Sequence, residues 1–258
     1  MYKTGKYLWV PALLLVCLLS ASCLPTAVSP GKAPPEWMQS SLETLAGGSS
    51  QVLLVTNEEA SGFTAMLYVL EKRDNLWRNA FPPLPALIGG KGFAPPGGKK
   101  EGDVRTPSGV FALKRTFGYA PEINSRMPYR QAGEEDIWVD DASSPDYNRW
   151  VRKGETSAAS FEIMKLKDDR YKYGIVIEYN TDPIVKGAGS AIFFHVRGGE
   201  NTPTLGCVAL SERDMLKVLG WLDPAAEPLA VLGTRDSLLL LARDARPSSG
   251  GLADEPKR

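Results

Sequence analysis

Histidine and cysteine are scarce in this chain of 258 residues. It contains one histidine, His195, and three cysteines, Cys17, Cys23 and Cys207. There is no CxxC pair, which argues against a dithiol redox role. His195 and Cys207 cannot by themselves complete a structural zinc site, which usually needs four such ligands. The sequence therefore predicts no metal site.

An excess of charge of either sign is also missing. Thirty Lys and Arg residues balance thirty Asp and Glu residues, so the formal net charge is zero. This balance removes the electrostatic argument for binding nucleic acid or an anionic membrane surface, and we expect no nucleic-acid partner. Hydrophobic residues make up 43% of the chain and charged residues 23%, which is ordinary for a globular protein.

The apolar run Leu8–Leu19 is too short to span a bilayer comfortably. Lys3 and Lys6 precede it and the small residues 20–22 follow it, which is the layout of a secretory signal peptide. We therefore predict a signal peptide over residues 1–22 and export to the periplasm or cell envelope.

Cys23 stands at the predicted cleavage point, where lipoprotein processing would acylate its sulfur. Ser20 stands where a large aliphatic residue is usual, so a plain signal peptide that leaves Cys23 in a disordered stub is the alternative. We predict lipidation at Cys23, with this anchor as the only membrane attachment. Residues 23–48 then form a Pro- and Gly-containing flexible tether, in which a short helix from Trp37 to Leu45 can form.

The rest of the chain is predicted to be a single, mostly β domain over residues 49–243, followed by a disordered tail over 244–258. Residues 114–170 read as irregular. Apolar and β-branched segments predict strands at 51–56, 64–71, 77–81, 110–113, 173–179, 191–196, 206–210 and 229–232. One main helix begins after Ser211, the expected N-cap, with Asp214 at its third position, and it packs beside the sheet.

His195 and Cys207 lie on two of these strands, separated by a polar loop. If a hairpin turn centres near Asn201, the two residues face each other, with about 4.5–5.5 Å between their Cβ atoms. A thiol and an imidazole at that separation are the minimum parts of an activated sulfur nucleophile. The alternative is a buried, hydrogen-bonded histidine beside a cysteine that packs as a small core residue.

On the catalytic interpretation, Cys207 is the nucleophile and His195 the general base and acid. Gly206 lets the backbone approach a substrate carbonyl, and the Cys207 N–H with a neighbouring N–H would bind the oxyanion. A backbone carbonyl, that of Val196 for example, would orient the imidazole. Thr204 either hydrogen-bonds within its loop or caps its own turn.

The order of these residues, histidine before cysteine, resembles that of the L,D-transpeptidase catalytic domain family (YkuD-type). Residues 100–111, KEGDVRTPSGVF, are similar to the Asp-x-x-Thr-Pro-x-Gly-x-Phe segment of that family. Residues 140–149 (DDASSPDYNR) and 187–195 (GAGSAIFFH) resemble a proteobacterial-like branch with a short His-to-Cys spacing. Residues 204–208 (TLGCV) stand where the family has Ser/Thr-His-Gly-Cys. Leu205 thus replaces a second histidine. Leucine cannot donate a hydrogen bond, so any help that this histidine gives to oxyanion binding or substrate positioning must come from elsewhere.

The resemblance implies a β-sandwich or open barrel with one main helix after the cysteine. It also implies a cofactor-free enzyme that forms peptidoglycan cross-links through a thioester on Cys207, and carbapenem-type β-lactams as possible inhibitors. The alternatives are an L,D-carboxypeptidase on the same stem peptides and a non-catalytic murein-binding lipoprotein. The candidate substrate contacts, each of which can equally be a structural or exposed loop residue, are Tyr147, Asn148, Arg149, Tyr179, Arg197 and Thr204.

Overall fold

The structure is a computed structural model that describes residues 1, 31–57 and 62–246. The predicted signal peptide apart from Met1, the lipidation site Cys23 and residues 247–258 of the predicted tail lie outside the described residues. Within the described part of the chain, no helix is long and apolar enough to cross a bilayer.

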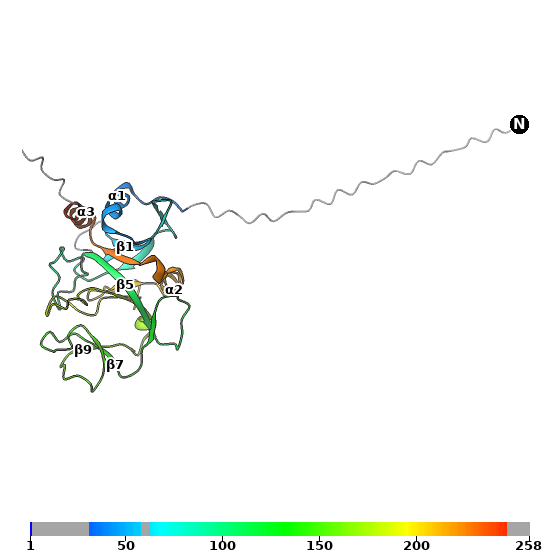
Figure 1. The fold of residues 1–258 in the computed structure, drawn as a ribbon. Helices are drawn as coiled ribbons and strands as arrows, with labels where there is room; N and C mark the ends of the chain where they lie inside the picture. The colour runs from blue at the N-terminus through cyan, green and yellow to red at the C-terminus, as the bar shows by residue number, and fades with distance from the viewer. Residues whose placement is uncertain (2–30, 58–61, 247–258) are drawn as a thin grey trace, which may run out of the picture.

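A closed barrel of strands forms the centre of the fold, which confirms the predicted mostly β class (Figure 1). β1 (Gln51–Thr56) pairs with both β13 (Leu229–Leu232) and β2 (Thr64–Arg73), and this second pairing closes the ring. β3 (Leu76–Asn79) extends the sheet at β2, and β6 (Tyr129–Gln131) extends it at β5 (Gly109–Gly118). The barrel strands pair in the order β1 (Gln51–Thr56), β13 (Leu229–Leu232), β5 (Gly109–Gly118), β10 (Tyr173–Ile177), β11 (Phe193–Val196), β12 (Val208–Leu210), β4 (Leu84–Leu87) and β2 (Thr64–Arg73).

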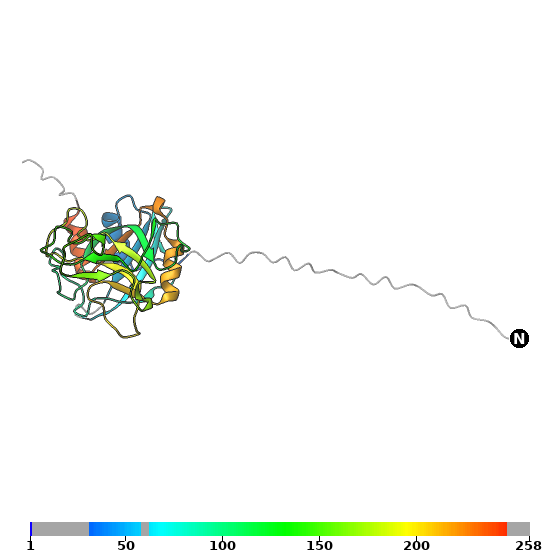
Figure 2. The ribbon, with the colours of Figure 1, turned by 90° about the horizontal axis from the view of Figure 1, so that it is seen from below.

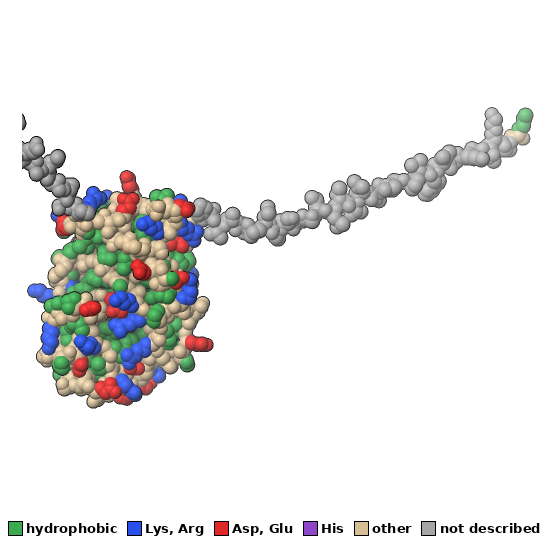
Figure 3. Space-filling model, in the orientation of Figure 1, with side chains coloured by type: hydrophobic (Ala, Val, Ile, Leu, Met, Phe, Trp, Pro, Cys, Tyr) green, Lys and Arg blue, Asp and Glu red, His purple; other side chains and the backbone are tan. Residues whose placement is uncertain are grey.

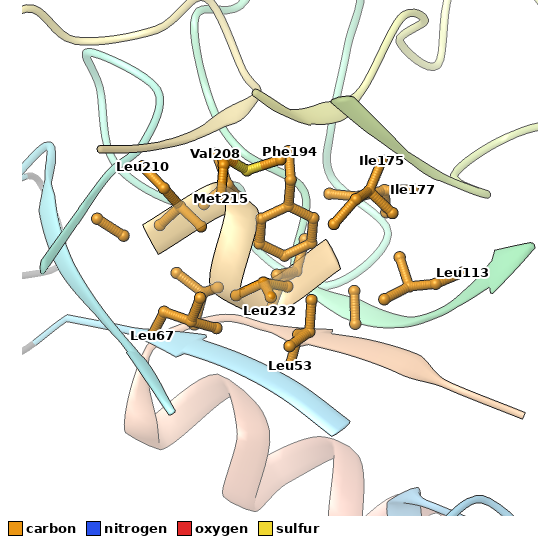
Figure 4. Packing of buried hydrophobic residues seen from close by; sticks show 14 of the residues in the cluster. Leu53, Leu67, Leu113, Ile175, Ile177, Phe194, Val208, Leu210, Met215 and Leu232 are labelled. Carbon is orange, nitrogen blue, oxygen red and sulfur yellow. The ribbon is translucent and has the colours of Figure 1, made fainter. Parts of the chain in front are cut away.

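Alternating side chains of the strands fill the barrel and coat its outside. On β1, Leu53 and Val55 point inward, whereas Val52 and Leu54 belong to a separate outer cluster. Both faces of β1 are therefore buried, which explains its nearly continuous apolar sequence. Figure 4 shows the inner cluster, whose labelled side chains converge from several strands and from the helix that carries Met215.

Two helices cover the outer face of β1 and β13. They are α1 (Glu36–Leu45) and α3 (Arg235–Asp244), which lie side by side above the barrel in Figure 1. Met38, Leu42 and Leu238 are almost fully buried in the outer cluster. The apolar face of each helix is thus what stabilises it on the sheet.

Helix α1 corrects the prediction of a flexible tether over residues 23–48. The second half of the segment 23–48 is folded, because Met38 and Leu42 recur at helical spacing and are buried against the barrel. The helix covers nearly the same residues as the short helix from Trp37 to Leu45 that the sequence allowed.

A small three-stranded sheet, which we call the cap sheet, lies on the other side of the barrel from α1 and α3 (Figures 1 and 2). It consists of β8 (Trp150–Arg152), β7 (Asp136–Val139) and β9 (Phe161–Ile163). The 3₁₀ turn η1 (Asp169–Tyr171) follows it. The prediction that residues 114–170 are irregular was therefore wrong. These strands are only three or four residues long, too short to show a clear alternation of apolar and polar positions.

The predicted main helix is α2 (Glu212–Trp221), and its cap is confirmed. The Ser211 hydroxyl accepts a hydrogen bond from the Asp214 N–H at 3.1 Å and donates to the Asp214 carboxylate at 2.6 Å. The 3₁₀ turn η2 (Pro224–Ala226) follows the helix. The surface seen in Figure 3 carries acidic and basic side chains interspersed, in keeping with the zero net charge.

Candidate active site

His195 and Cys207 come from neighbouring strands, but the strands do not form the predicted hairpin. β11 and β12 are parallel, and Phe194 is in register with Val208. His195 therefore lies opposite Ala209 rather than Cys207. The connecting loop is too long for a tight turn. It returns beside the segment that follows β4, where the Thr204 N–H donates to the Ile88 carbonyl at 3.0 Å.

The parallel arrangement nevertheless leaves the thiol and the imidazole on one face. Cys207 lies one position before β12, level with Phe193 by extension of the register, and Phe193 and His195 alternate onto the same side of β11. That side is the outside of the barrel, under the cap sheet and η1. Phe193 and Cys207 share a cluster there with Trp138, and the Tyr171 ring packs edge-on against His195 with centroids 5.4 Å apart.

The imidazole of His195 is oriented by the backbone carbonyl of Val196, 2.8 Å from Nδ1. A carbonyl can only accept, so Nδ1 carries the proton of the neutral ring and Nε2 is left with its lone pair. This tautomer is the one that a general base acting through Nε2 requires.

The thiol of Cys207 is held by backbone groups of the loop before β11 and of β11 itself. Sγ donates to the Ala191 carbonyl at 3.2 Å and accepts from the Phe193 N–H at 3.4 Å. To pass its proton to His195, the thiol has to leave the Ala191 carbonyl. The bond to the Phe193 N–H favours the anionic sulfur that results.

Burial sets the protonation states of the His195 imidazole and the Cys207 thiol, since each residue is only 7% exposed. It lowers the pKa of His195 to about 4, against the Val196 hydrogen bond, which favours the protonated ring. It also raises the pKa of the Cys207 thiol well above its ordinary value, and Glu162 adds to this effect. The resting pair is therefore a neutral thiol and a neutral imidazole. A thiolate–imidazolium ion pair is therefore disfavoured at rest.

The turn before Cys207 is built by Thr204. Its hydroxyl donates to the Cys207 carbonyl at 2.7 Å and accepts from the Gly206 N–H at 3.1 Å. The Gly206 N–H is therefore engaged within the turn. Among the described residues, no hydrogen bond engages the Cys207 N–H, which leaves that donor for an oxyanion.

The position of Gly206 requires a glycine, because of both its backbone conformation and its close neighbours. Its φ is +152°, and a Cβ placed there would lie 3.0 Å from the Arg105 carbonyl oxygen and 3.2 Å from the Ile192 side chain. Leu205, one residue earlier, is 77% exposed. The buried cysteine thus lies two residues from a side chain that projects into solvent.

Asn148, predicted as a substrate contact, holds the thiol's acceptor, the Ala191 carbonyl, in place. Its Oδ1 accepts from the Trp138 indole at 2.8 Å and from the Ala191 N–H at 3.1 Å. Its Nδ2 donates to the Tyr179 and Asn180 carbonyls at 3.1 and 2.6 Å. These four bonds saturate the side chain. They help to hold Ala191 at a φ of +52°, a conformation that costs a residue with a Cβ about 1–2 kcal/mol.

Asn148→Ala is expected to lower the free energy of unfolding by roughly 2–4 kcal/mol, because it leaves the buried Trp138 and Ala191 N–H groups without acceptors. Urea denaturation measures the change. Arg149→Ala, at the exposed next position, is the matched control and should change stability by less than about 0.5 kcal/mol. A loss below about 1 kcal/mol for Asn148→Ala would contradict the positioning role.

Tyr147 and Tyr179, two other predicted contacts, also spend their hydroxyls within the protein. The Tyr147 hydroxyl donates to the Glu101 carboxylate and accepts from the Gly189 N–H at 3.0 Å. The Tyr179 hydroxyl donates to the Ala188 carbonyl, and burial raises the pKa of Tyr179 to about 12. Both rings fasten the 187–191 loop beside the thiol.

The two arginines that were predicted as substrate contacts lie apart from the groups that hold the thiol. Arg149 is exposed at the edge of the cap sheet. Arg197 lies four residues beyond Phe193, about 13 Å along the strand direction, and its guanidinium is 3.6 Å from the Glu200 carboxylate. Their role as contacts for a substrate carboxylate stays a prediction.

Three charged or polar groups near the thiol were missed from the sequence: Lys99, Glu162 and Tyr171. Glu162 on β9 accepts a hydrogen bond from the Tyr171 hydroxyl, and burial raises the pKa of Glu162 to about 7. No sequence signal marked these two residues, since their segment reads as irregular. Lys99 lies in a Gly-rich loop that looks like a solvated turn, yet only 6% of it is exposed.

A thiol and an imidazole on one sheet face, next to an unengaged backbone N–H, can carry acyl transfer. The model of the family described as L,D-transpeptidase catalytic domain (YkuD) matches residues 64–234, well over half of the chain. The protein belongs to this family. Searches of the curated proteins and of the solved structures found no match.

Proposed function

We propose that the protein is a cysteine-dependent L,D-transpeptidase that cross-links peptidoglycan stem peptides through a thioester on Cys207. One observation carries the proposal. The thiol and the imidazole share the outer barrel face, and the Val196 carbonyl fixes the tautomer that leaves Nε2 of His195 free to accept a proton.

In the first half-reaction, Sγ attacks the carbonyl of the L-centred diamino acid of a donor stem while Nε2 of His195 takes the thiol proton. The Cys207 N–H stabilises the oxyanion. The peptide C–N bond then breaks, and the imidazolium gives its proton to the departing amine of the terminal D-residue. This leaves a thioester and a neutral imidazole.

In the second half-reaction, the amine of a neighbouring stem attacks the thioester carbonyl, and His195 takes a proton from that amine. The C–S bond breaks, the imidazolium of His195 gives its proton to the departing sulfur, and an amide cross-link results. If water attacks instead, the product is a shortened stem, and the enzyme acts as an L,D-carboxypeptidase.

The peptidoglycan substrate implies a location in the cell envelope. We propose export by the signal peptide over residues 1–22 and attachment to a membrane through a lipid on Cys23. Carbapenem-type β-lactams are the expected inhibitors, because their strained carbonyl would acylate the thiol in the same way as a stem peptide. No nucleic-acid partner is proposed.

Mass spectrometry of the products tests the reaction. Purified protein is incubated with tetrapeptide stems in the presence and absence of an acceptor amine. We expect an acyl adduct on Cys207, release of the terminal D-residue, and cross-linked product only when the acceptor is present. Water addition at the same rate with or without the acceptor would assign the carboxypeptidase activity instead. Murein binding without any adduct or product would assign a non-catalytic binding role.

A further inference from the structure

Lys99 is a buried cation beside the turn that carries Cys207. Its side chain runs between two glycines of different loops. A Cβ built on Gly206 would lie 3.7 Å from Lys99 Cε, and one built on Gly189 would lie 3.0 Å from Cγ and 3.2 Å from Cε. The end of the lysine stem therefore lies against the residue that precedes the nucleophile.

The turn that contains Lys99 is held by Asp103 and by the lysine itself. Asp103 closes this turn by accepting the Lys100 and Arg105 N–H groups at 2.8 and 2.9 Å. The Lys99 ammonium donates to Asp103 at 2.6 Å and to the Lys100 carbonyl at 2.8 Å. These bonds use two of its three hydrogens.

Burying an ammonium is costly, and a loop lysine ordinarily keeps its charge in water. The neighbouring Lys100 does so and is exposed. The ion pair with Asp103 offsets part of this cost. Its consequence is that a positive charge lies beside the turn that carries Cys207, where an anionic sulfur would have to form in a buried setting.

Arg170 on η1 is the other cation on this face. Its charge acts on His195, Glu162 and Tyr171, whereas Lys99 is the cation that acts on the Cys207 thiol. Glu162 and Tyr171 approach from the cap side, and His195 from β11. Burial raises the pKa of the Cys207 thiol most strongly, with Glu162 acting in the same direction and Lys99 in the opposite one. His195 is neutral at rest, because burial lowers its pKa.

We propose that Lys99 is a positioning residue whose charge stabilises the anionic form of the Cys207 sulfur, with Asp103 holding the ammonium in place. The catalytic meaning of this charge rests on the proposed function, whereas its effect on the thiol does not. The role can therefore be measured without any peptidoglycan substrate.

The experiment follows alkylation of Cys207 by iodoacetamide, a neutral reagent, as a function of pH in the full chain, with peptide mapping to separate Cys207 from the other cysteines. Lys99→Gln is the main variant, because it keeps hydrogen-bond donation to Asp103 but removes the charge. We expect its alkylation profile to move upward by about one pH unit, or roughly tenfold slower reaction near neutral pH. Lys99→Met should behave alike, and Lys99→Arg should restore most of the rate.

Lys100→Met is the matched control on the same loop and should leave the profile unchanged. Thermal melting verifies that each variant is folded. Wild-type alkylation in folded Lys99→Gln would overturn the proposal and leave the transpeptidase assignment intact. Conversely, a shifted profile in a protein that yields no cross-links would support the lysine's effect on the thiol and refute the proposed function.

Discussion

Cys207→Ala is expected to abolish thioester formation and to lower the rate of cross-linking by roughly 10³-fold or more, because the variant has no atom that can form the acyl bond. The fold should persist. The sulfur makes only two long hydrogen bonds to backbone groups, and alanine leaves a void of about one atom. We expect a loss of about 1 kcal/mol in the free energy of unfolding.

Two measurements separate a lost nucleophile from a lost fold. Mass spectrometry quantifies cross-linked muropeptides, and urea denaturation gives stability. Leu216→Ala, an exposed position on α2, is the control for a neutral apolar-to-alanine change and should keep full activity. Turnover by Cys207→Ala within tenfold of the wild-type rate would rule out Cys207 as the nucleophile.

His195→Gln is expected to reduce turnover by about 10²–10⁴-fold, the usual contribution of a general base. It should also change how stability depends on pH. The pKa of His195 is about 4 in the folded state, below the ordinary 6.5. As the pH falls, the unfolded chain therefore binds this proton at a higher pH than the folded protein does. The wild-type protein therefore loses stability as the pH falls from about 6.5 to about 4, by roughly 3 kcal/mol in total.

The variant should lack this dependence. Glu162 has the opposite sign, since its pKa is raised from 4.5 to about 7 and its burial destabilises the fold as the pH rises through that range. Both proteins share Glu162 and the other carboxylates. The difference between their urea-unfolding free energies at pH 7, 5 and 4 therefore isolates the imidazole. A constant difference across this range would show that His195 titrates as an exposed histidine does.

The shared face of His195 and Cys207 was predictable even though the hairpin was wrong. The two residues are an even number of positions apart. Both the expected antiparallel register and the observed parallel one place them on the same side of the sheet. The direction of β12 was not predictable, because it depends on the pairing of Thr204 in the 197–207 loop with residues 88–90, which are distant in the sequence.

Other features needed contacts that no local pattern encodes. The cap sheet is made of very short strands whose apolar residues, such as Trp138, become core only once they meet Phe193 on the barrel. The burial of Lys99 depends on two glycines, Gly189 and Gly206, that are distant from it in the sequence. The Ser211 cap was readable because capping is a local hydrogen bond.

Side chains of β11 alternate between the inside and the outside of the barrel, so the placement of His195 depends on the register of this strand. Phe194 fills the interior, whereas Phe193 faces the cap sheet and His195 faces η1. A slip of this strand by one residue would turn the imidazole into the apolar interior and a phenyl ring toward the sulfur. The packing that closes the barrel therefore also keeps His195 and Cys207 on one outer face, and a chain with this strand out of register would lack that arrangement.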